Sequence, residues 1–353
     1  MILKEGHVVG KRETSINKSE EGLSVISNLE LYLCPDVRSI IKKLPDDFKS
    51  VLEEIRLRVN RPLMVSGNQK EYFVDINGGL TLTPVGGYYI SKENIEKTLQ
   101  FASNYSIYSI EDELKNGYIT IHGGHRIGIV GKVLMGNKGI RTLKNFSGLN
   151  IRVCREKLGI ASKALPYIIN SKGEFLNTLL VSPPQCGKTT LLRDIIRTIS
   201  EGVPHMNFRG LKVGVVDERS ELGACFEGVP QNDLGPRTDI LDCCPKAEGM
   251  IMLIRSMSPQ VIATDEIGRT EDSIAIEEAM MAGIKLITTV HGRSLGDILN
   301  KNIIGKLVGD GVFERIIFLS NSNGVGTMDS VIDGSNLTYL YKGVNYKDDR
   351  QVV

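Results

Sequence analysis

Residues 179–192 read LLVSPPQCGKTTLL, and this stretch decides the fold of the chain. An apolar run (179–181) leads into a Pro/Gly loop that ends in Gly187-Lys188-Thr189. Apolar residues at helical spacing follow at once, at Leu191, Leu192, Ile195, Ile196 and Ile199. A strand, a loop ending in Lys-Thr and a helix, in this order, are typical of a phosphate-binding loop.

The loop predicts a site for ATP and Mg²⁺. Backbone N–H groups and the N-terminus of the helix can hold a polyphosphate. Lys188 would reach the β- and γ-phosphates, and the Thr189 hydroxyl would ligate Mg²⁺. We expect nucleotide contacts along the whole loop, at Ser182, Pro183, Pro184, Gln185, Cys186, Gly187, Lys188, Thr189 and Thr190.

Two residues of the loop raise questions. The phosphate-loop pattern begins with glycine, and this chain has Ser182 at that position. If the position needs a positive φ, serine costs on the order of 1 kcal/mol, which would weaken nucleotide affinity without abolishing it. Oxidation of Cys186 should block nucleotide binding, because the thiol lies inside the loop.

A second motif, PQVIATDEIGR (259–269), is an apolar strand followed by two carboxylates. Asp265 would hold Mg²⁺ through water, and Glu266 would orient and deprotonate the water that attacks the γ-phosphate. Acidic residues also begin many helices, so the motif alone is weak. Its position after Lys188, with strand–helix units between, makes the two motifs support each other.

Two further strands end in polar residues. KVGVVDERSELG (212–223) ends a strand in Asp217-Glu218, and either carboxylate could assist Mg²⁺ or water positioning at the nucleotide crevice. The alternative is a surface loop with a charge cluster. KLITTVHG (285–292) ends in Thr288, Thr289 and His291, and His291 could sense the γ-phosphate or simply be a satisfied loop histidine.

Hydrolysis also needs cations that stabilise the charge of the transition state, often an arginine from another domain or subunit. The candidates are Arg56, Arg58, Arg126, Arg237 and Arg269, each of which could instead be a surface ion-pair partner. His122 and His125 do not predict a metal site, because no cysteine or third histidine lies nearby.

The pattern of the chain predicts two domains. A polar tail (1–28) precedes an α+β domain (29–150) with a helical pattern over 31–52, a strand in 53–67, a helix over 91–103 and a hairpin around Gly123-Gly124. Residues 145–175 would form the joint. From there strands at 178–182, 212–217, 260–264 and 285–290 alternate with helices, so 151–342 predicts a parallel α/β ATPase domain, with a β-rich section at 312–342 and a tail at 343–353.

Composition excludes several classes of protein. The net charge of +1 and the absence of tryptophan argue against a surface dominated by nucleic-acid binding. The amino terminus lacks the apolar run of a secretory signal, and no 18-residue apolar segment is present. Six cysteines without a C-x-x-C pair fit a reducing compartment, so we expect a cytoplasmic protein.

The four motifs over 175–300 resemble the additional-strand, catalytic-glutamate P-loop ATPases with a RecA-like fold, and within them the type II/IV secretion ATPases. In that group the phosphate loop is followed by an acidic strand end, a Walker B element and a strand ending in histidine. The resemblance assigns these roles to Lys188-Thr189, Asp217-Glu218, Asp265-Glu266 and His291.

Four strings are similar to a narrower family, the stage III sporulation protein AA family of endospore-forming bacteria: EEIRLRVNRPL (53–63), GYITIHGGHRIGIVGK (117–132), GPRTDILDCCPKAEGM (235–250) and LIRSMSPQVIATDEIGR (253–269). This resemblance implies an ATPase of the mother cell that works beside a secretion-like channel to the forespore. It also implies a membrane-protein partner, stage III sporulation protein AB, attachment to the membrane through that partner, and a ring of six subunits.

Two other functions stay open at this point. A nucleic-acid-associated P-loop ATPase would use the arginines of the first domain, although the near-neutral charge and the lack of a basic-aromatic stripe count against it. A scaffold that binds ATP with little turnover is motivated by Ser182 alone.

Overall fold

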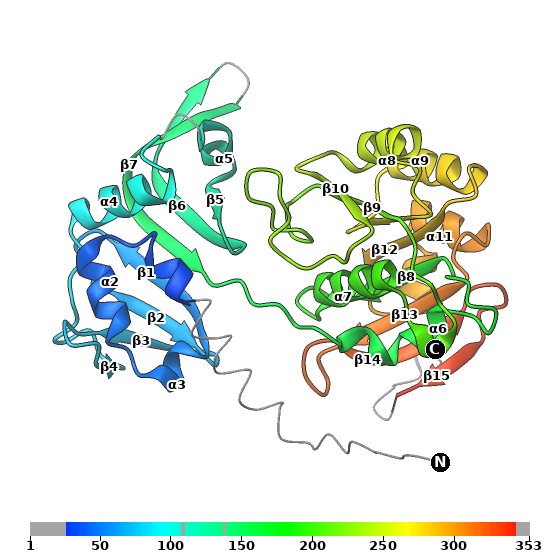
Figure 1. Cartoon of the computed structure of the whole chain (residues 1–353), viewed down its shortest axis with the longest axis horizontal. Helices are drawn as coiled ribbons and strands as arrows, with labels where there is room; N and C mark the ends of the chain where they lie inside the picture. Colours follow the sequence, from blue (N-terminus) through cyan, green and yellow to red (C-terminus); the bar gives the residue numbers. More distant parts are fainter. Residues whose placement is uncertain (1–25, 107–109, 137–138, 344–353) are drawn as a thin grey trace, which may run out of the picture. The chain divides into compact units, whose positions relative to one another are not determined.

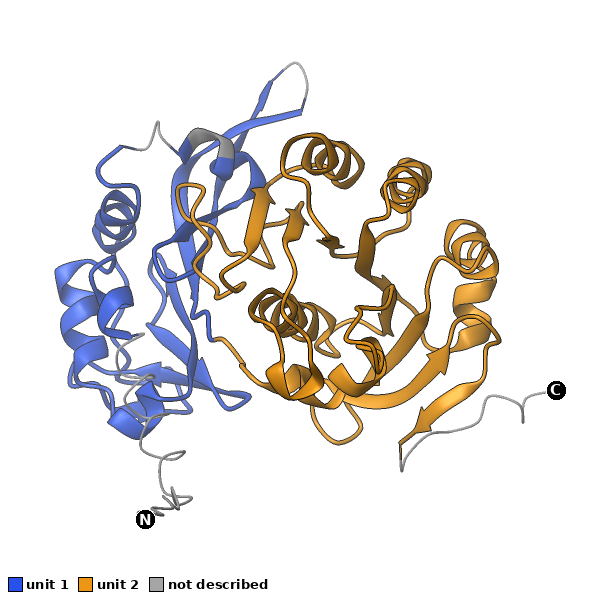
Figure 2. Cartoon of the chain, turned by 45° about the vertical axis from the view of Figure 1, so that its right-hand side comes forward, with its two compact units in different colours: residues 1–155 blue, residues 156–353 orange. Residues whose placement is uncertain are grey.

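The chain is described by a computed structural model that covers residues 26–106, 110–136 and 139–343. These residues form two units, 1–155 and 156–353, shown in different colours in Figure 2. The expected tails therefore lie almost wholly outside the described residues. Residues 26–30 are already helical, and Ile26 is buried in the core of the first unit.

The first unit is built on one antiparallel sheet of seven strands, in the order β4-β3-β2-β1-β7-β6-β5. Its strands are β1 (Leu52–Arg58), β2 (Met64–Gly67), β3 (Lys70–Val74), β4 (Leu80–Thr81), β5 (Tyr118–Ile121), β6 (His125–Gly136) and β7 (Gly139–Arg152). Its helices are α2 (Pro35–Lys42), α3 (Asp46–Lys49), α4 (Lys92–Ala102) and α5 (Glu111–Asn116).

The expected elements of this unit are largely present. Alternation buries Ile55 and Leu57 of β1 in the core, and the predicted hairpin turns at Gly123-Gly124, both with positive φ. The expected helix over 91–103 is α4, which Ser91 caps, and the Asn94 side chain completes the reciprocal cap. Pro45 divides the helical segment expected over 31–52 into α2 and α3, and residue 52 differs, since it already begins β1.

The second unit is a sheet of eight strands in the order β10-β9-β11-β12-β8-β13-β14-β15. The first six run parallel to one another, β14 pairs antiparallel with β13, and β15 pairs antiparallel with β14. The strands are β8 (Thr178–Ser182), β9 (Val213–Asp217), β10 (Thr238–Asp242), β11 (Val261–Thr264), β12 (Lys285–His291), β13 (Arg315–Ser320), β14 (Thr327–Asp333) and β15 (Tyr339–Lys342). All four predicted parallel strands are present, and β10 is an addition to them.

Helices cover both faces of this sheet (Figure 1). The apolar side of α7 (Lys188–Glu201) packs on one face with a short helix, α6 (Leu165–Ile168), nearby. The opposite face carries α8 (Lys246–Ser256), α9 (Thr270–Met281), α10 (Leu295–Leu299) and α11 (Asn302–Gly309). The central strands β8, β9, β11, β12 and β13 are buried on both sides, which explains why they form continuous apolar runs in the sequence.

The strand order determines where the motifs meet. Strand β12 pairs with β8 on one side and with β11 on the other. The segments that follow β8, β12 and β11 therefore lie side by side at the carboxyl edge of the parallel sheet. This edge is where open α/β sheets bind their ligands.

Candidate functional site

The phosphate loop joins β8 to α7, and its backbone needs glycine at one position. Gly187 has φ +84° and caps α7. A Cβ atom there would lie 2.9 Å from Val325 Cγ1, so a side chain would meet both strain and a close contact. The only other positive φ in the loop belongs to Gln185.

Ser182, in contrast, is the last residue of β8 and has strand geometry, opposite His291 of β12. The position therefore does not need a positive φ, and the conditional strain cost of serine does not arise. The Ser182 hydroxyl donates to the carbonyl of Pro183 at 2.7 Å and accepts from Lys188 Nζ at 3.2 Å. The serine thus contributes polar contacts within the loop.

The remaining loop residues differ in exposure. Pro184 and Gln185 are exposed, while Pro183 and Thr190 are half-buried. Cys186 is buried and its thiol points to the carbonyl of Pro184 at 3.5 Å. Burial limits the access of an oxidant to this thiol, so its oxidation would be slow while the loop keeps this conformation.

Lys188 is buried, and its ammonium group is held by the loop itself. Nζ donates to the Ser182 carbonyl at 3.0 Å and to the Pro183 carbonyl at 3.2 Å, and lies 3.0 Å from His291 Nδ1. Burial lowers the pKa of Lys188, and the nearby carboxylates of Asp265 and Glu266 oppose that shift. Burial therefore disfavours the charged form of Lys188, and the phosphate oxygens of a bound polyphosphate would stabilise that form by direct charge pairing.

A chain of hydroxyl and carboxylate groups crosses the three strand ends. Thr189 Oγ1 donates to Asp265 Oδ2 at 2.9 Å, and the hydroxyl of Thr289 donates to the other oxygen of the same carboxylate. Thr289 Oγ1 also accepts the backbone N–H of Glu266 at 2.9 Å. Thr289 thereby holds both acidic residues of the second motif in place.

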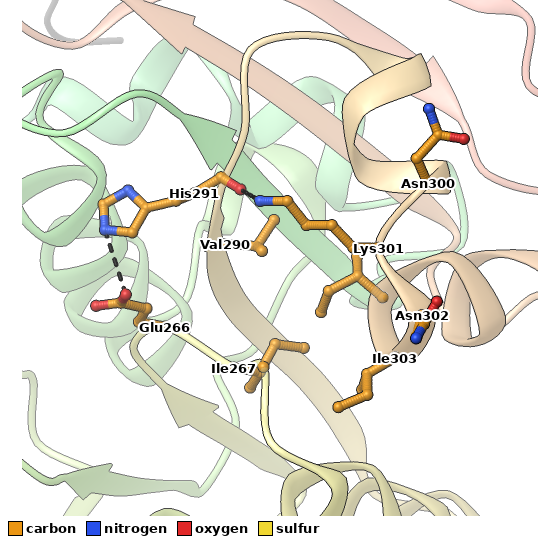
Figure 3. Close-up of a pocket in the computed structure, with 10 residues that line it drawn as sticks. Glu266, Ile267, Val290, His291, Asn300, Lys301, Asn302 and Ile303 are labelled. Atoms are coloured by element: carbon orange, nitrogen blue, oxygen red, sulfur yellow. Dashed lines mark hydrogen bonds and ion pairs between the residues drawn. The ribbon is translucent and has the colours of Figure 1, made fainter.

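Glu266 turns its carboxylate toward β12 (Figure 3). Its φ of +48° is unusual for a non-glycine residue. Glu266 Oε1 lies 3.3 Å from His291 Nε2, and Oε2 lies 3.4 Å from Arg219 Nη1. The Glu266 side chain is 38% exposed, so water reaches it.

These contacts fit one tautomer of His291. If the ammonium of Lys188 donates to Nδ1, the ring proton belongs on Nε2, from where it can be donated to Glu266. Lys188, His291 and Glu266 then form one continuous path from the phosphate loop to the carboxylate.

A pocket of about 460 Å³ opens beside Glu266 and His291. Its far wall includes Asn300, Lys301 and Asn302 at the start of α11, and the Lys301 ammonium donates to the His291 carbonyl (Figure 3). Neither Lys301 nor Arg219 was expected at this site. A lysine ten residues after a histidine belongs to no known motif. Only the turn of the chain through α10 returns Lys301 to the neighbourhood of His291.

The third motif divides its two carboxylates between different tasks. Asp217 is buried and accepts the backbone N–H groups of Glu221, Leu222 and Gly223, each at 2.8 Å, so it caps the loop that follows β9. Burial raises its pKa. The Glu218 carboxylate forms an ion pair with Lys246 and lies 3.6 Å from Arg269 Nη1.

Only some of the candidate arginines have described contacts near these motifs. Arg237 donates to the carbonyls of Ser200 and Glu201 and so holds the end of α7. Arg269 is 70% exposed and pairs with Glu218. Arg56, Arg58 and Arg126 belong to the first unit, and their part in hydrolysis stays a prediction.

The fold is similar to the folds of an ATPase and of a pilus motor with solved structures. The structure is similar to the ATPase DotB of Legionella pneumophila, with a TM-score of 0.50, 12% identity and coverage of 94% of this chain and 83% of that chain. It is also similar to the pilus retraction motor PilT crystallised with ADP, with a TM-score of 0.51, 14% identity and coverage of 79% and 78%. At these identities the similarity concerns the fold alone.

The family follows from the sequence matches. The model of the family described as "Sporulation stage III, protein AA" matches residues 26–337, and the chain belongs to this family. Stage III sporulation protein AA of Bacillus subtilis (strain 168) is 41% identical over 297 residues, which are 84% of this chain and 92% of that protein. The uncharacterized protein ycf45 of Cyanidium caldarium is 31% identical over 170 residues, 47% of each chain.

Among the described residues, none of the helices combines the length and the apolar character that crossing a bilayer requires.

Proposed function

We propose that the chain binds ATP with Mg²⁺ and hydrolyses it at the carboxyl edge of the second sheet. The observation that carries this proposal is the convergence of Lys188, Thr189, Asp265, Glu266 and His291 from three neighbouring strand ends. The order β11-β12-β8 places one strand between the two nucleotide motifs, as in the additional-strand class of P-loop ATPases.

The residues present fit a magnesium ion. Mg²⁺ prefers hard oxygen ligands, and the Thr189 hydroxyl and the Asp265 carboxylate lie 2.9 Å apart. Thr189 would ligate the ion directly and Asp265 through water. When bound, Mg²⁺ neutralises charge on the β- and γ-phosphate oxygens.

In this proposal Glu266 is the general base and His291 reports on the phosphate. Glu266 is accessible to water and accepts a hydrogen bond, as a base that activates water must. On nucleotide binding, the Lys188 ammonium would leave the loop carbonyls and contact phosphate oxygens instead, because these carry a full negative charge. Because Lys188 now also contacts His291, that exchange would alter the His291–Glu266 contact and couple phosphate occupancy to the base.

Glu218 has a supporting role in the proposal. Its ion pairs with Lys246 and Arg269 place two cations beside the carboxyl edge of β9. The pairs lower the pKa of Glu218, chiefly through the hydrogen bond from Lys246, so the carboxylate stays ionised at neutral pH.

A Glu266→Gln variant tests the assignment. The amide keeps the shape and still binds ATP but cannot take a proton, so we expect turnover to fall about 10²–10⁴-fold. Glu278→Gln, an exposed change on α9, is the matched control and should leave turnover unchanged. Equal phosphate release by wild type and Glu266→Gln would refute the assignment of Glu266 as the general base.

The same pair of measurements separates hydrolysis from an ATP-gated scaffold. A scaffold would show a thermal shift with ATP and negligible phosphate release from the wild type. Ser182, the one reason for that alternative, has strand geometry and accepts a hydrogen bond from Lys188, so the strain that would weaken nucleotide binding is absent at this position.

Membership of the family supports a role in sporulation. We propose that hydrolysis energises assembly of, or transport through, a channel complex between mother cell and forespore. A membrane partner such as stage III sporulation protein AB, and a homo-oligomeric ring of six, belong to this proposal. Mass determination in ATP, with ATPase rate measured against protein concentration, tests the ring: a monomer with a constant rate per chain would contradict it.

A further inference from the structure

The end of the β6–β7 hairpin is a two-stranded ribbon without strand neighbours. Strand β5 pairs with residues 125–128 of β6, and β1 pairs with residues 148–152 of β7. Beyond these, residues 132–136 pair only with residues 139–144 among the described strands. Figure 1 shows the two strands running past the rest of their sheet. A two-stranded ribbon is marginally stable in water by itself, so a surface that covers it would stabilise it.

One face of this ribbon is aliphatic. Val133 lies opposite Leu143, and Met135 lies opposite Ile140. Leu143 belongs to the buried core, whereas Val133, Met135 and Ile140 are 43%, 71% and 49% exposed. The row of side chains thus begins inside the unit and continues into solvent. The exposed part is unfavourable in free energy, because apolar surface there contacts water, and a partner that covered it would remove this penalty.

The other face carries two lysines next to Leu134 and Thr142, and the bulge carries an arginine. Lys132 and Lys144 lie directly opposite each other, and Arg141 occupies the irregularity between the pairs 134–142 and 135–140. All three are exposed, and none pairs with a carboxylate among the described residues. Like charges placed opposite each other are unfavourable without an anion.

The sequence around the ribbon is cationic throughout. From Leu114 to Arg155 it contains no aspartate or glutamate and eight lysines or arginines. The near-neutral charge of the whole chain hides this local excess. A segment this free of carboxylates can approach an anionic surface closely.

We propose that residues 132–136 and 139–144 dock on the surface of a bilayer that contains anionic phospholipid. Val133, Met135 and Ile140 would enter the boundary between headgroups and acyl chains, and Lys132, Arg141 and Lys144 would contact the phosphates. This differs from the expected attachment through a partner alone, because the chain itself would touch the lipid.

Lipid fits this surface better than nucleic acid does. A nucleic-acid strand would match the cations but leave the three aliphatic side chains in water. Single-strand binders add aromatic side chains for base stacking, and residues 132–144 contain none. The combination of exposed aliphatics and cations on one ribbon is the combination that a headgroup region satisfies.

Vesicle flotation of the full chain tests the charged part. We expect binding to phosphatidylcholine vesicles that contain phosphatidylglycerol, weaker binding at high salt and little binding to phosphatidylcholine alone. Lys132→Glu with Lys144→Glu should lower the partition coefficient about 30-fold or more. Lys70→Glu with Lys92→Glu changes two exposed lysines of the same unit and should retain binding.

A second pair of variants tests the aliphatic part. Met135→Ser with Ile140→Ser keeps the charge, and we expect severalfold weaker binding. Leu82→Ser with Val85→Ser removes two exposed aliphatics elsewhere in the unit and should bind like wild type. Unchanged unfolding curves would show that the variants remain folded.

The proposal is overturned if wild type does not float with anionic vesicles, or if the control variants lose as much binding as the ribbon variants. Binding to single-stranded DNA or RNA that depends on Lys132 and Lys144, without vesicle binding, would assign the ribbon to nucleic acid instead. None of these measurements uses ATP, so their outcome is independent of the proposed hydrolysis.

Discussion

Four carboxylates at the ends of two strands show how neighbours assign different tasks to one chemical group. Asp217 is buried, and its carboxylate oxygens accept hydrogen bonds from three backbone N–H groups. Glu218 pairs with Lys246, and Asp265 accepts hydrogen bonds from two hydroxyls. The Glu266 side chain contacts a histidine and is accessible to water. Only Glu266 therefore combines the access and the partner that a general base needs.

The ion pairs of Glu218 predict a pH-dependent contribution to stability. Its pKa is lowered from 4.5 in the folded state, so folding favours the ionised form. The stabilisation is present above pH 4.5 and is lost as pH falls through the lowered folded-state pKa. We expect the difference in unfolding free energy between wild type and Glu218→Gln to be larger at pH 7 than in this acid range.

Urea denaturation of both proteins over that pH range measures this difference. A gap that stays constant with pH would show that the pair with Lys246 does not lower the pKa. A fall in turnover with unchanged stability would instead support a direct role of Glu218 at the nucleotide.

At the scale of elements, the parallel sheet brings the site together through its loops. In the turn after β9, three successive backbone N–H groups donate to the Asp217 carboxylate. Arg193 of α7 donates to the carbonyls of Glu221 and Leu222 in the same turn. The turn is thus fixed both to its strand and to the helix that follows the phosphate loop.

Asp217→Ala should destabilise the second unit substantially. Each buried N–H that loses its acceptor costs about 1–3 kcal/mol, and three are affected, although water will compensate part of the loss. Asp217→Asn keeps one carbonyl oxygen and should fall between alanine and wild type. Chemical denaturation checks the order. Equal stability of all three proteins would contradict a capping role.

At the scale of the molecule, every residue of the proposed nucleotide site belongs to one unit. Lys188, Thr189, Asp265, Glu266 and His291 all lie within 156–353. The unit has two apolar clusters of its own, one on each face of its sheet. It therefore has the core that an independently folding domain needs.

We expect residues 156–353 expressed alone to fold and to bind ATP. At about 100 times the dissociation constant, ATP should raise the unfolding free energy by roughly 2.7 kcal/mol, and Lys188→Ala should reduce this gain. Thermal and chemical unfolding with and without ATP measure it. A gain seen in the full chain and absent from the isolated unit would show that binding needs the first unit.

Much of the second unit could be predicted from local pattern. Strands buried on both faces appear as apolar runs, and the phosphate loop and the Asp265-Glu266 pair stand out because their chemistry requires particular residues at fixed spacing. Strand β10 was missed because its residues are only half-buried and do not form an apolar run. The exposed apolar and cationic ribbon was missed because the net charge was read over the whole chain.

The sequence by itself determined the class of fold, the nucleotide motifs and the family, because each is carried by contiguous residues whose spacing has a direct physical meaning. Only the tertiary structure decided which residues meet. It placed β12 between β8 and β11, brought Arg219 and Lys301 to the site, gave Asp217 a capping role and showed that Ser182 is extended. Strand order and the packing of distant side chains depend on contacts between segments far apart in the chain, and no local pattern records them.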